Sequence, residues 1–405
     1  MADNSQPQAF IYDGLRSPFG RHGGSLSAMR ADDLLATVIK AVVERTGFDK
    51  SDIEDVIAGC TNQAGEDCRN IARHAGLLAG LPVETGGLTV NRLCGSGLAA
   101  TLDAARALRC GEGDLFIAAG VESMSRAPYV MSKAETPFSR SAQMFDSTIG
   151  ARFPNNKIIE AFGGDTMPQT ADNIAGDLGI SRERSDAFAI ASQKKYALAK
   201  ADGFFNAEIL AIDLPVKRTA PPVTISDDEH PRPQTTLEKL ATLKPLFDGG
   251  VVTAGNASGI NDGAAALLIG NREIGEKSAQ APRGRIISGA IAGVAPRVMG
   301  LGPAPASTKA LDRAGLTLKD MDVIEINEAF ATQVLGCTQL LGMADDDSRL
   351  NANGGAIAIG HPLGASGARL VLTTLRQLER GGGRYGLVSM CIGVGQGIAA
   401  VIERV

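Results

Sequence analysis

A cysteine flanked by glycines is the first residue whose surroundings suggest chemistry. Cys94 lies in the segment Thr89-Val90-Asn91-Arg92-Leu93-Cys94-Gly95-Ser96-Gly97-Leu98. The apolar run 88–93 predicts the end of a strand, and apolar residues then recur at helical spacing over 98–108. The N–H groups of a first helical turn lower the pKa of a thiol, and glycines admit a ligand or a second backbone segment. The same pattern also fits an inert buried cysteine in a tight turn.

Three glycine-rich segments of the second half carry further reactive side chains. They are Asn327-Glu328-Ala329-Phe330-Ala331, the stretch 353–364 with His361, and Cys391-Ile392-Gly393-Val394-Gly395-Gln396-Gly397. Taken singly, Asn327 fits a helix cap, His361 a turn and Cys391 a core thiol. The last segment is G-x-G-x-G without the following acidic residue of a dinucleotide site, which disfavours nicotinamide binding.

Alternating strands and helices must position these side chains. We predict strands at 10–12, 56–59 and 115–120, and helices at 31–46 and 69–80. This alternation is typical of a mainly parallel sheet covered on both faces. Residues 122–250 interrupt it with short helices such as 182–200 and a Pro-rich stretch at 215–233. We expect an excursion of loops that covers a site, with strand-like sequence resuming at 251–259.

The second half of the chain repeats the first. A shift of 270 residues aligns Ser96-Gly97 with Ser366-Gly367, together with the apolar helix positions that follow and the glycines that end the helix. Further upstream, 55–57 matches 322–324. Gly364, close to His361, takes the place of Cys94, so the halves differ where chemistry is expected. Two similar α/β halves facing one another predict a site between them.

Composition excludes several classes of protein. The 405 residues predict two or three domains, and no apolar run reaches the 18 to 20 residues of a membrane span. The beginning of the chain has no secretory signal. The net charge of −5, without long charged blocks, makes nucleic acid an improbable partner. Six scattered cysteines without a C-x-x-C pair favour the reducing cytoplasm over disulfides or a zinc site, and we expect no metal.

Together, the Cys94 segment and the three glycine-rich segments resemble the thiolase family from Phe10 to the C-terminus. The resemblance extends to 120–125, 255–259 and 261–265. It implies an α/β fold with two duplicated βαβαβαββ halves in a layered α-β-α-β-α arrangement and an inserted loop domain. We expect 1–121 with 251–275 to form the N-terminal half, 122–250 the loop domain that covers the site and binds CoA, and 276–405 the C-terminal half.

The resemblance also implies a reaction. Thiolases cleave 3-oxoacyl-CoA reversibly by thiolysis, or condense acyl-CoA with acetyl-CoA, through an acyl-enzyme intermediate. By this likeness Cys94 is the nucleophile, His361 the group that activates it and Cys391 the general acid/base. One oxyanion is held by His361 with a water on Asn327, and the other by the N–H groups of Cys94 and Gly393.

Ligand contacts follow from the same resemblance. Ser258 and Arg232 match positions that contact CoA, and Met167 and Phe330 match walls of the acyl pocket. CoA and acyl-CoA are substrates, and no permanently bound cofactor is expected. Thiolases dimerise through their sheet-bearing halves, so we expect a homotetramer, with a homodimer as the alternative.

Two rival functions were weighed against this interpretation. A decarboxylating 3-ketoacyl synthase shares the duplicated fold and the cysteine. In such enzymes the matching residues follow one another along the chain in the order Cys-His-His or Cys-His-Asn, whereas Asn327 here precedes His361. A non-catalytic acyl-CoA binding protein would tolerate loss of the cysteines and the histidine, and all three motifs are intact.

One departure concerns the substrate. Short-chain thiolases typically show His-Met-Gly where this chain has Thr166-Met167-Pro168. Together with the segments 62–67 and 228–233, this local sequence is more similar to that of 3-oxoadipyl-CoA thiolases and of 3-oxoacyl-CoA thiolases that accept a broader range of substrates. This favours a pocket for longer acyl groups with a distal carboxylate held by a cation from the excursion, although a preference for acetoacetyl-CoA stays open.

Overall fold

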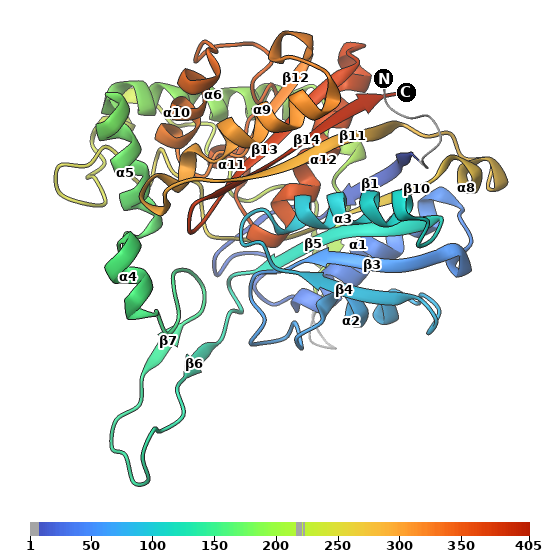
Figure 1. Cartoon of the computed structure of the whole chain (residues 1–405), viewed down its shortest axis with the longest axis horizontal. Helices are drawn as coiled ribbons and strands as arrows, with labels where there is room; N and C mark the ends of the chain where they lie inside the picture. The colour runs from blue at the N-terminus through green and yellow to red at the C-terminus, as the bar shows by residue number, and fades with distance from the viewer. Residues whose placement is uncertain (1–7, 216–220, 222) are drawn as a thin grey trace.

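The computed structural model describes residues 8–215, 221 and 223–405 (Figure 1). The first seven residues of the expected N-terminal half lie outside the described residues. So do 216–220 and 222 of the Pro-rich stretch.

A ten-stranded sheet runs through the molecule in the order β12-β13-β14-β11-β1-β10-β5-β3-β4, with β2 beside β10. At its middle, β1 (Ala9–Arg16) pairs antiparallel with β11 (Gly284–Gly293). The other strands are β2 (Gly20–Arg21), β3 (Ile53–Gly59), β4 (Gly86–Val90), β5 (Leu115–Ser123), β10 (Asn261–Gly270), β12 (Val323–Ile326), β13 (Tyr385–Ile392) and β14 (Gln396–Arg404). Counted outward from the central pair, the first half therefore has the order β1-β10-β5-β3-β4 and the second half the order β11-β14-β13-β12. Corresponding strands occupy the same place in both halves.

Helices divide the molecule into five layers (Figure 1). The inner helices α3 (Ser96–Cys110) and α12 (Leu363–Gly381) share one apolar core with strands of both halves. One outer layer holds α1 (Ala31–Thr46) and α2 (Ile71–Leu78), and the other holds α9 (Pro303–Ala314) and α10 (Ala331–Leu341). This confirms the predicted α-β-α-β-α arrangement. The expectation of a mainly parallel sheet was wrong, because among the described strands of this sheet parallel pairing is confined to β3 with β4 and β5 and to β12 with β13.

The duplication is visible element by element. When the predicted shift of 270 is added to the residue numbers of α3, the result is 366–380, which lies within α12. The same shift takes β5 to 385–393, which matches β13 to within one residue. The counterpart of β4 is reduced to a single parallel bridge between Ile324 and Leu350. The second half therefore keeps the βαβαβαββ order, with its third strand almost lost.

Between β5 and β10 the chain leaves the sheet, as expected. The strands β6 (Tyr129–Met131) and β7 (Met144–Asp146) form an arm that projects from the body (Figure 1). The remaining elements of this excursion are α4 (Asn156–Phe162), α5 (Met167–Leu178), α6 (Arg182–Ala201), η2 (Phe204–Ala207), β8 (Ile212–Asp213), β9 (Thr224–Ile225) and α7 (Leu237–Ala241). Buried ion pairs anchor the excursion to the sheet, because Arg16 on β1 lies 2.6 Å from Asp228 and 2.7 Å from Glu208.

The short elements outside the excursion are η1 (Lys50–Asp52), α8 (Arg272–Lys277), η3 (Pro296–Leu301), η4 (Leu318–Asp320) and α11 (Ala356–Ile359). In the part of the chain that the structure describes, no helix has the length and apolarity that a membrane crossing requires.

The expectation that strand structure resumes at 251–259 was wrong. This segment is a compact loop, and the strand begins at Asn261. The side chain of Asn256 closes the loop, because its amide donates to the carbonyl of Val251 at 3.0 Å and its oxygen accepts the N–H of Thr253 at 2.8 Å. The apolar residues Val251 and Val252 pack into cores without joining a ladder.

Candidate active site

Cys94 lies at the predicted junction between a strand and a helix, after β4 and before α3. The turn places Leu93 at φ +46°, a left-handed conformation. The hydroxyl of Ser96 stabilises this turn, since it donates to the carbonyl of Leu93 at 2.6 Å and accepts the N–H of Arg92 at 2.9 Å. The thiol is thereby held at the end of the sheet, half-buried.

The loop between β13 and β14 lies against this turn. The backbone amide of Gly393 lies near the Cys94 thiol and lowers its pKa. A Cβ on Gly393 would lie 3.3 Å from Leu93 Cδ1 and 3.6 Å from Met167 Sδ. The structure therefore brings Cys94, Gly393 and Met167 together, as the sequence predicted.

The expected lowering of the Cys94 pKa was wrong for the resting site. Burial raises the pKa of this thiol to about 11, although the amides of Gly393 and Cys94 lower it. Loss of water around the thiolate outweighs the effect of the two amides. The resting site therefore holds a thiol rather than a thiolate.

His361 and Asn327 form a buried pair. Asn327 follows β12, and its Nδ2 lies 3.4 Å from His361 Nε2. The other ring nitrogen, Nδ1, lies 2.7 Å from the hydroxyl of Ser366. Both ring nitrogens thus have partners other than a thiol. Asn327 does not cap a helix, because α10 begins at Ala331.

Burial also determines the charge of His361. It lowers the pKa of the imidazole to about 3, and the guanidinium of Arg369 lowers the pKa further in the same direction. The ring is neutral at physiological pH. It can accept a proton, but it supplies no positive charge that would lower the pKa of a neighbouring thiol.

Cys391 lies on β13 at the floor of an apolar cluster. Burial raises the pKa of its thiol well above the ordinary value, and the neighbouring Cys94 adds to the effect. Met167 and Phe330 belong to the same cluster, as predicted, with Ala171, Val252, Met299, Ala329 and Ala257. A 3-oxoacyl group placed here would be shielded from water.

The two predicted CoA contacts lie on neighbouring loops. Ser258 donates its N–H to the carbonyl of Ala329 at 2.9 Å, next to Phe330. Arg232 is exposed, and its charge acts on the buried His230, whose ring packs against Gly259. The departure at Thr166 has a structural role, because its N–H and its hydroxyl each donate to Gln169 Oε1 at 2.8 Å at the start of α5.

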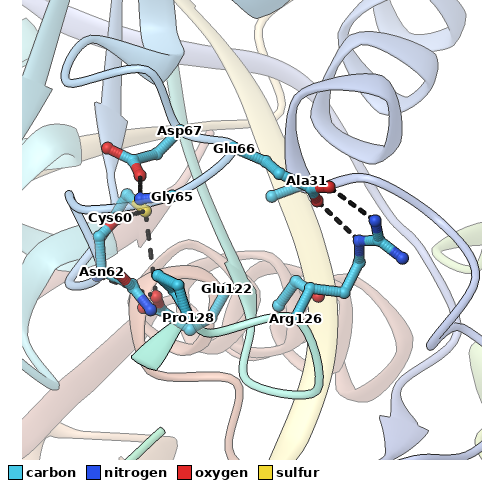
Figure 2. Close-up of a pocket in the computed structure, with 10 residues that line it drawn as sticks. Ala31, Cys60, Asn62, Gly65, Glu66, Asp67, Glu122, Arg126 and Pro128 are labelled. Atoms are coloured by element: carbon cyan, nitrogen blue, oxygen red, sulfur yellow. Dashed lines mark hydrogen bonds and ion pairs between the residues drawn. The ribbon is translucent and has the colours of Figure 1, made fainter. Parts of the chain in front are cut away.

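A buried carboxylate joins the loops of both halves. Glu122 accepts the N–H groups of Thr61 at 3.0 Å, Asn62 at 3.1 Å and Gly364 at 3.0 Å. Figure 2 shows it beside Cys60, in a cavity of about 20 Å³. That volume suits about one water, and none of the predicted site residues lines the cavity. Glu122 connects the cavity to the candidate site, because its charge raises the pKa of the Cys94 thiol.

Sequence reasoning missed several residues of the site. Asn261 accepts the backbone N–H of His361 at 2.9 Å, and Ser366 contacts its ring. Met299 joins the apolar wall from η3. Ser366 had a signal in the repeat, where it aligns with Ser96, but Met299 lies in a segment without a recognisable pattern.

Comparison with known proteins identifies the class to which this site and fold belong. The family described as thiolase, N-terminal domain, matches residues 9–273, and thiolase, C-terminal domain, matches 280–404. The chain therefore belongs to the thiolase family, and the enzyme is an acyltransferase.

Individual relatives cover almost the entire chain. A beta-ketoadipyl-CoA thiolase of Acinetobacter baylyi is 58% identical over 98% of this chain and 99% of its own length. A 3-oxoadipyl-CoA/3-oxo-5,6-dehydrosuberyl-CoA thiolase of Escherichia coli is 57% identical over 98% and 100%. Among solved structures, human mitochondrial 3-ketoacyl-CoA thiolase in complex with CoA has a TM-score of 0.91 at 39% identity, covering 98% of each chain.

Proposed function

We propose that this thiolase cleaves 3-oxoadipyl-CoA with CoA, giving acetyl-CoA and succinyl-CoA. The similarity to relatives named for this substrate, at 57% and 58% identity over nearly the whole chain, carries the proposal. It agrees with the sequence pattern around Thr166 and Met167. A preference for acetoacetyl-CoA is the second candidate, since a 44% identical relative from Thiocystis violacea is named acetyl-CoA acetyltransferase.

In the proposed mechanism, Cys94 attacks the keto carbon and His361 takes its proton. The C2–C3 bond breaks, and Cys391 protonates the departing acetyl-CoA enolate. Cys391 then deprotonates the incoming CoA thiol, which takes the acyl group off Cys94. The neutral state of His361 supports its role as proton acceptor.

Two oxyanion sites complete the mechanism. The N–H groups of Cys94 and Gly393 hold the oxygen of one carbonyl, and the lowering effect of both amides on the pKa of the Cys94 thiol supports this assignment. His361 and a water on Asn327 hold the other. Asn327 Oδ1 is buried without a hydrogen-bond partner among the described residues, so it can accept a hydrogen bond from that water.

CoA and acyl-CoA are the proposed ligands, contacted by Ser258 and Arg232. The human relative solved with CoA supports CoA binding by this fold. The distal carboxylate of the substrate needs a cation from the excursion. Arg182 and Arg184 are poor candidates, because they already pair with Asp186 and Asp345.

Acylation of Cys94 tests the mechanism. Incubation with acetyl-CoA followed by peptide mass spectrometry should find an acetyl group on Cys94, and Cys94→Ala should remove nearly all acyl transfer. An acetyl group found only on another cysteine would refute the assignment.

Relative rates test the substrate. We expect kcat/KM for thiolysis of 3-oxoadipyl-CoA to exceed that for acetoacetyl-CoA. The proposal fails if acetoacetyl-CoA is preferred tenfold over every longer or carboxylated 3-oxoacyl-CoA, a difference of about 1.4 kcal/mol in transition-state binding.

We further propose a homotetramer in the cytoplasm. The edge strand β4 exposes Leu88, which supports pairing with a second copy. The arm of β6 and β7 exposes Tyr129, Met131 and Met144, which supports a second contact. All six cysteines are free thiols, in keeping with a reducing compartment.

The domain boundaries of the sequence analysis are proposed unchanged, as 1–121 with 251–275, 122–250 and 276–405. The chain returns to the sheet at β10, and this strand pairs with both β1 and β5. This pairing supports the assignment of 251–275 to the same half as 1–121.

A further inference from the structure

The hydrogen bonds of His361 determine which of its nitrogens carries the proton. Its Nδ1 lies 2.7 Å from Ser366 Oγ, and the Ser366 hydroxyl donates to the carbonyl of Pro362 at 2.9 Å. A serine hydroxyl has one hydrogen and two lone pairs. With that hydrogen on the carbonyl of Pro362, the hydroxyl accepts from His361, and this arrangement places the ring proton on Nδ1.

The opposite side of the ring agrees with this assignment. Nε2 lies 3.4 Å from the side-chain nitrogen of Asn327, a group that only donates. A neutral ring with its proton on Nδ1 presents a lone pair at Nε2 toward that amide. Two independent neighbours thus favour the same tautomer.

The internal repeat gives Ser366 a counterpart with a similar task. Ser366 aligns with Ser96, and both are fully buried in the first turns of the inner helices. Ser96 bonds to Leu93 and Arg92 and so holds the turn that carries Cys94. Ser366 bonds to Pro362 and to the ring of His361. Each half therefore uses the serine at this position to hold the residue that carries its share of the chemistry.

We propose that Ser366 is a positioning residue that keeps His361 in the Nδ1–H tautomer, so that the Nε2 lone pair, which faces the Asn327 amide in the resting site, can receive the thiol proton of Cys94. This inference rests on the proposed mechanism. In the step concerned, the S–H bond of Cys94 breaks and an N–H bond forms at Nε2. The sulfur electron pair forms the new bond to the keto carbon, and the other ring proton stays on Nδ1, hydrogen-bonded to Ser366 Oγ.

Removal of the hydroxyl should abolish the preference for one tautomer. In Ser366→Ala, a proton on Nδ1 would be buried without an acceptor, which is unfavourable. A proton on Nε2 would instead face the Asn327 amide, so both tautomers are populated and the rings protonated on Nε2 can no longer accept a proton from the thiol. Alanine fits the space left by serine, so the fold should be retained.

A direct test is the tautomer itself, measured without turnover. The chain has four histidines, so magic-angle-spinning ¹⁵N spectra of histidine-labelled microcrystals can be assigned, with His361→Asn identifying the signal. Wild-type His361 should show a protonated Nδ1 and a bare Nε2, and Ser366→Ala should show a mixture of both tautomers. A protonated Nε2 in the wild type would overturn the proposal, even if Cys94 is acylated.

Kinetics give the second test. By analogy with other residues that orient a functional histidine, Ser366→Ala should lower the rate of Cys94 acetylation by about 10- to 100-fold, with KM changed less than about twofold. Ser288→Ala is the matched control, because Ser288 is also buried and donates to a backbone carbonyl, that of Ala310 at 2.7 Å. It should acetylate at the wild-type rate. A rate for Ser366→Ala within twofold of wild type would contradict the proposed role.

Discussion

Gly97 and Gly364 lie in direct backbone contact where the two inner helices begin. A Cβ on Gly97 would approach the carbonyl oxygen of Gly364 to 2.5 Å. Glycine at 97 lets α3 and α12 come this close, whereas a Cβ on Gly364 would instead meet the carbonyl oxygen of Val121. The contact joins the start of the helix that follows Cys94 to the start of the helix that follows His361, and so sets the distance between their two loops.

Gly97→Ala should therefore destabilise the protein by about 1–3 kcal/mol, as overpacking does in a filled core. Acylation of Cys94 should fall as well, because the loops are forced apart. Gly176→Ala is the control, since a Cβ there meets nothing within 4 Å in α5. It should be neutral or slightly stabilising in urea unfolding. Equal stability of both variants would show that the helix contact is not tight.

Alkylation of Cys94 should rise with pH without a plateau near neutrality. Because burial raises the pKa of the thiol to about 11, the thiolate fraction grows about tenfold per pH unit between pH 7 and 9. Iodoacetamide labelling followed by mass spectrometry measures this rate, with exposed Cys68 and Cys110 as internal references. A plateau below pH 8 would instead indicate a resting thiolate paired with a protonated His361.

Cys391→Ser should separate the two half-reactions. Cys94 can still accept an acyl group slowly, whereas condensation and thiolysis need the proton transfers assigned to Cys391. We expect a loss of about 10²- to 10⁴-fold in steady-state turnover, with acetyl-Cys94 still detectable in the variant. Loss of both steady-state turnover and acetyl-Cys94 in the variant would contradict the separate roles proposed for the two cysteines.

Stability should decrease as the pH falls from about 6.5 toward 4. Burial, with Arg232 and Arg21, lowers the pKa of His230 to about 4, whereas the unfolded chain binds this proton near pH 6.5. At pH 5 the unfolded state therefore gains about 2 kcal/mol from His230 alone. In His230→Gln, the difference in unfolding free energy between pH 7.5 and pH 5 should shrink by about that amount. An unchanged difference would mean that His230 is protonated in the folded state.

The arm should control assembly. Replacing Tyr129, Met131 and Met144 by serine removes exposed apolar area from β6 and β7 and should convert tetramers to dimers in multi-angle light scattering. Leu198→Ser is the control, because Leu198 is 71% exposed on α6 outside the arm. A wild-type protein that is a stable active monomer would contradict both proposed assemblies.

Much of the fold was predictable because local signals and the repeat agreed. The helix 31–46 and the shift of 270 appear in the structure as expected. The loop at 251–259 could not be predicted, because its conformation depends on the side chain of Asn256. The pKa of Cys94 was predicted with the wrong sign, since burial of the thiol in the folded chain outweighs the effect of the amides beside it. A local sequence pattern cannot predict burial by segments that are distant in the chain.

The carboxylate of Glu122 has a consequence for how the enzyme works. One of its oxygens, Oε2, accepts N–H groups from Thr61 in one half and Gly364 in the other, while the sheet continues across both through β1 and β11. A hinge motion of one half relative to the other would break these buried hydrogen bonds to Glu122. The loop of Thr61 and the start of α12 next to His361 are therefore tied together in the resting enzyme.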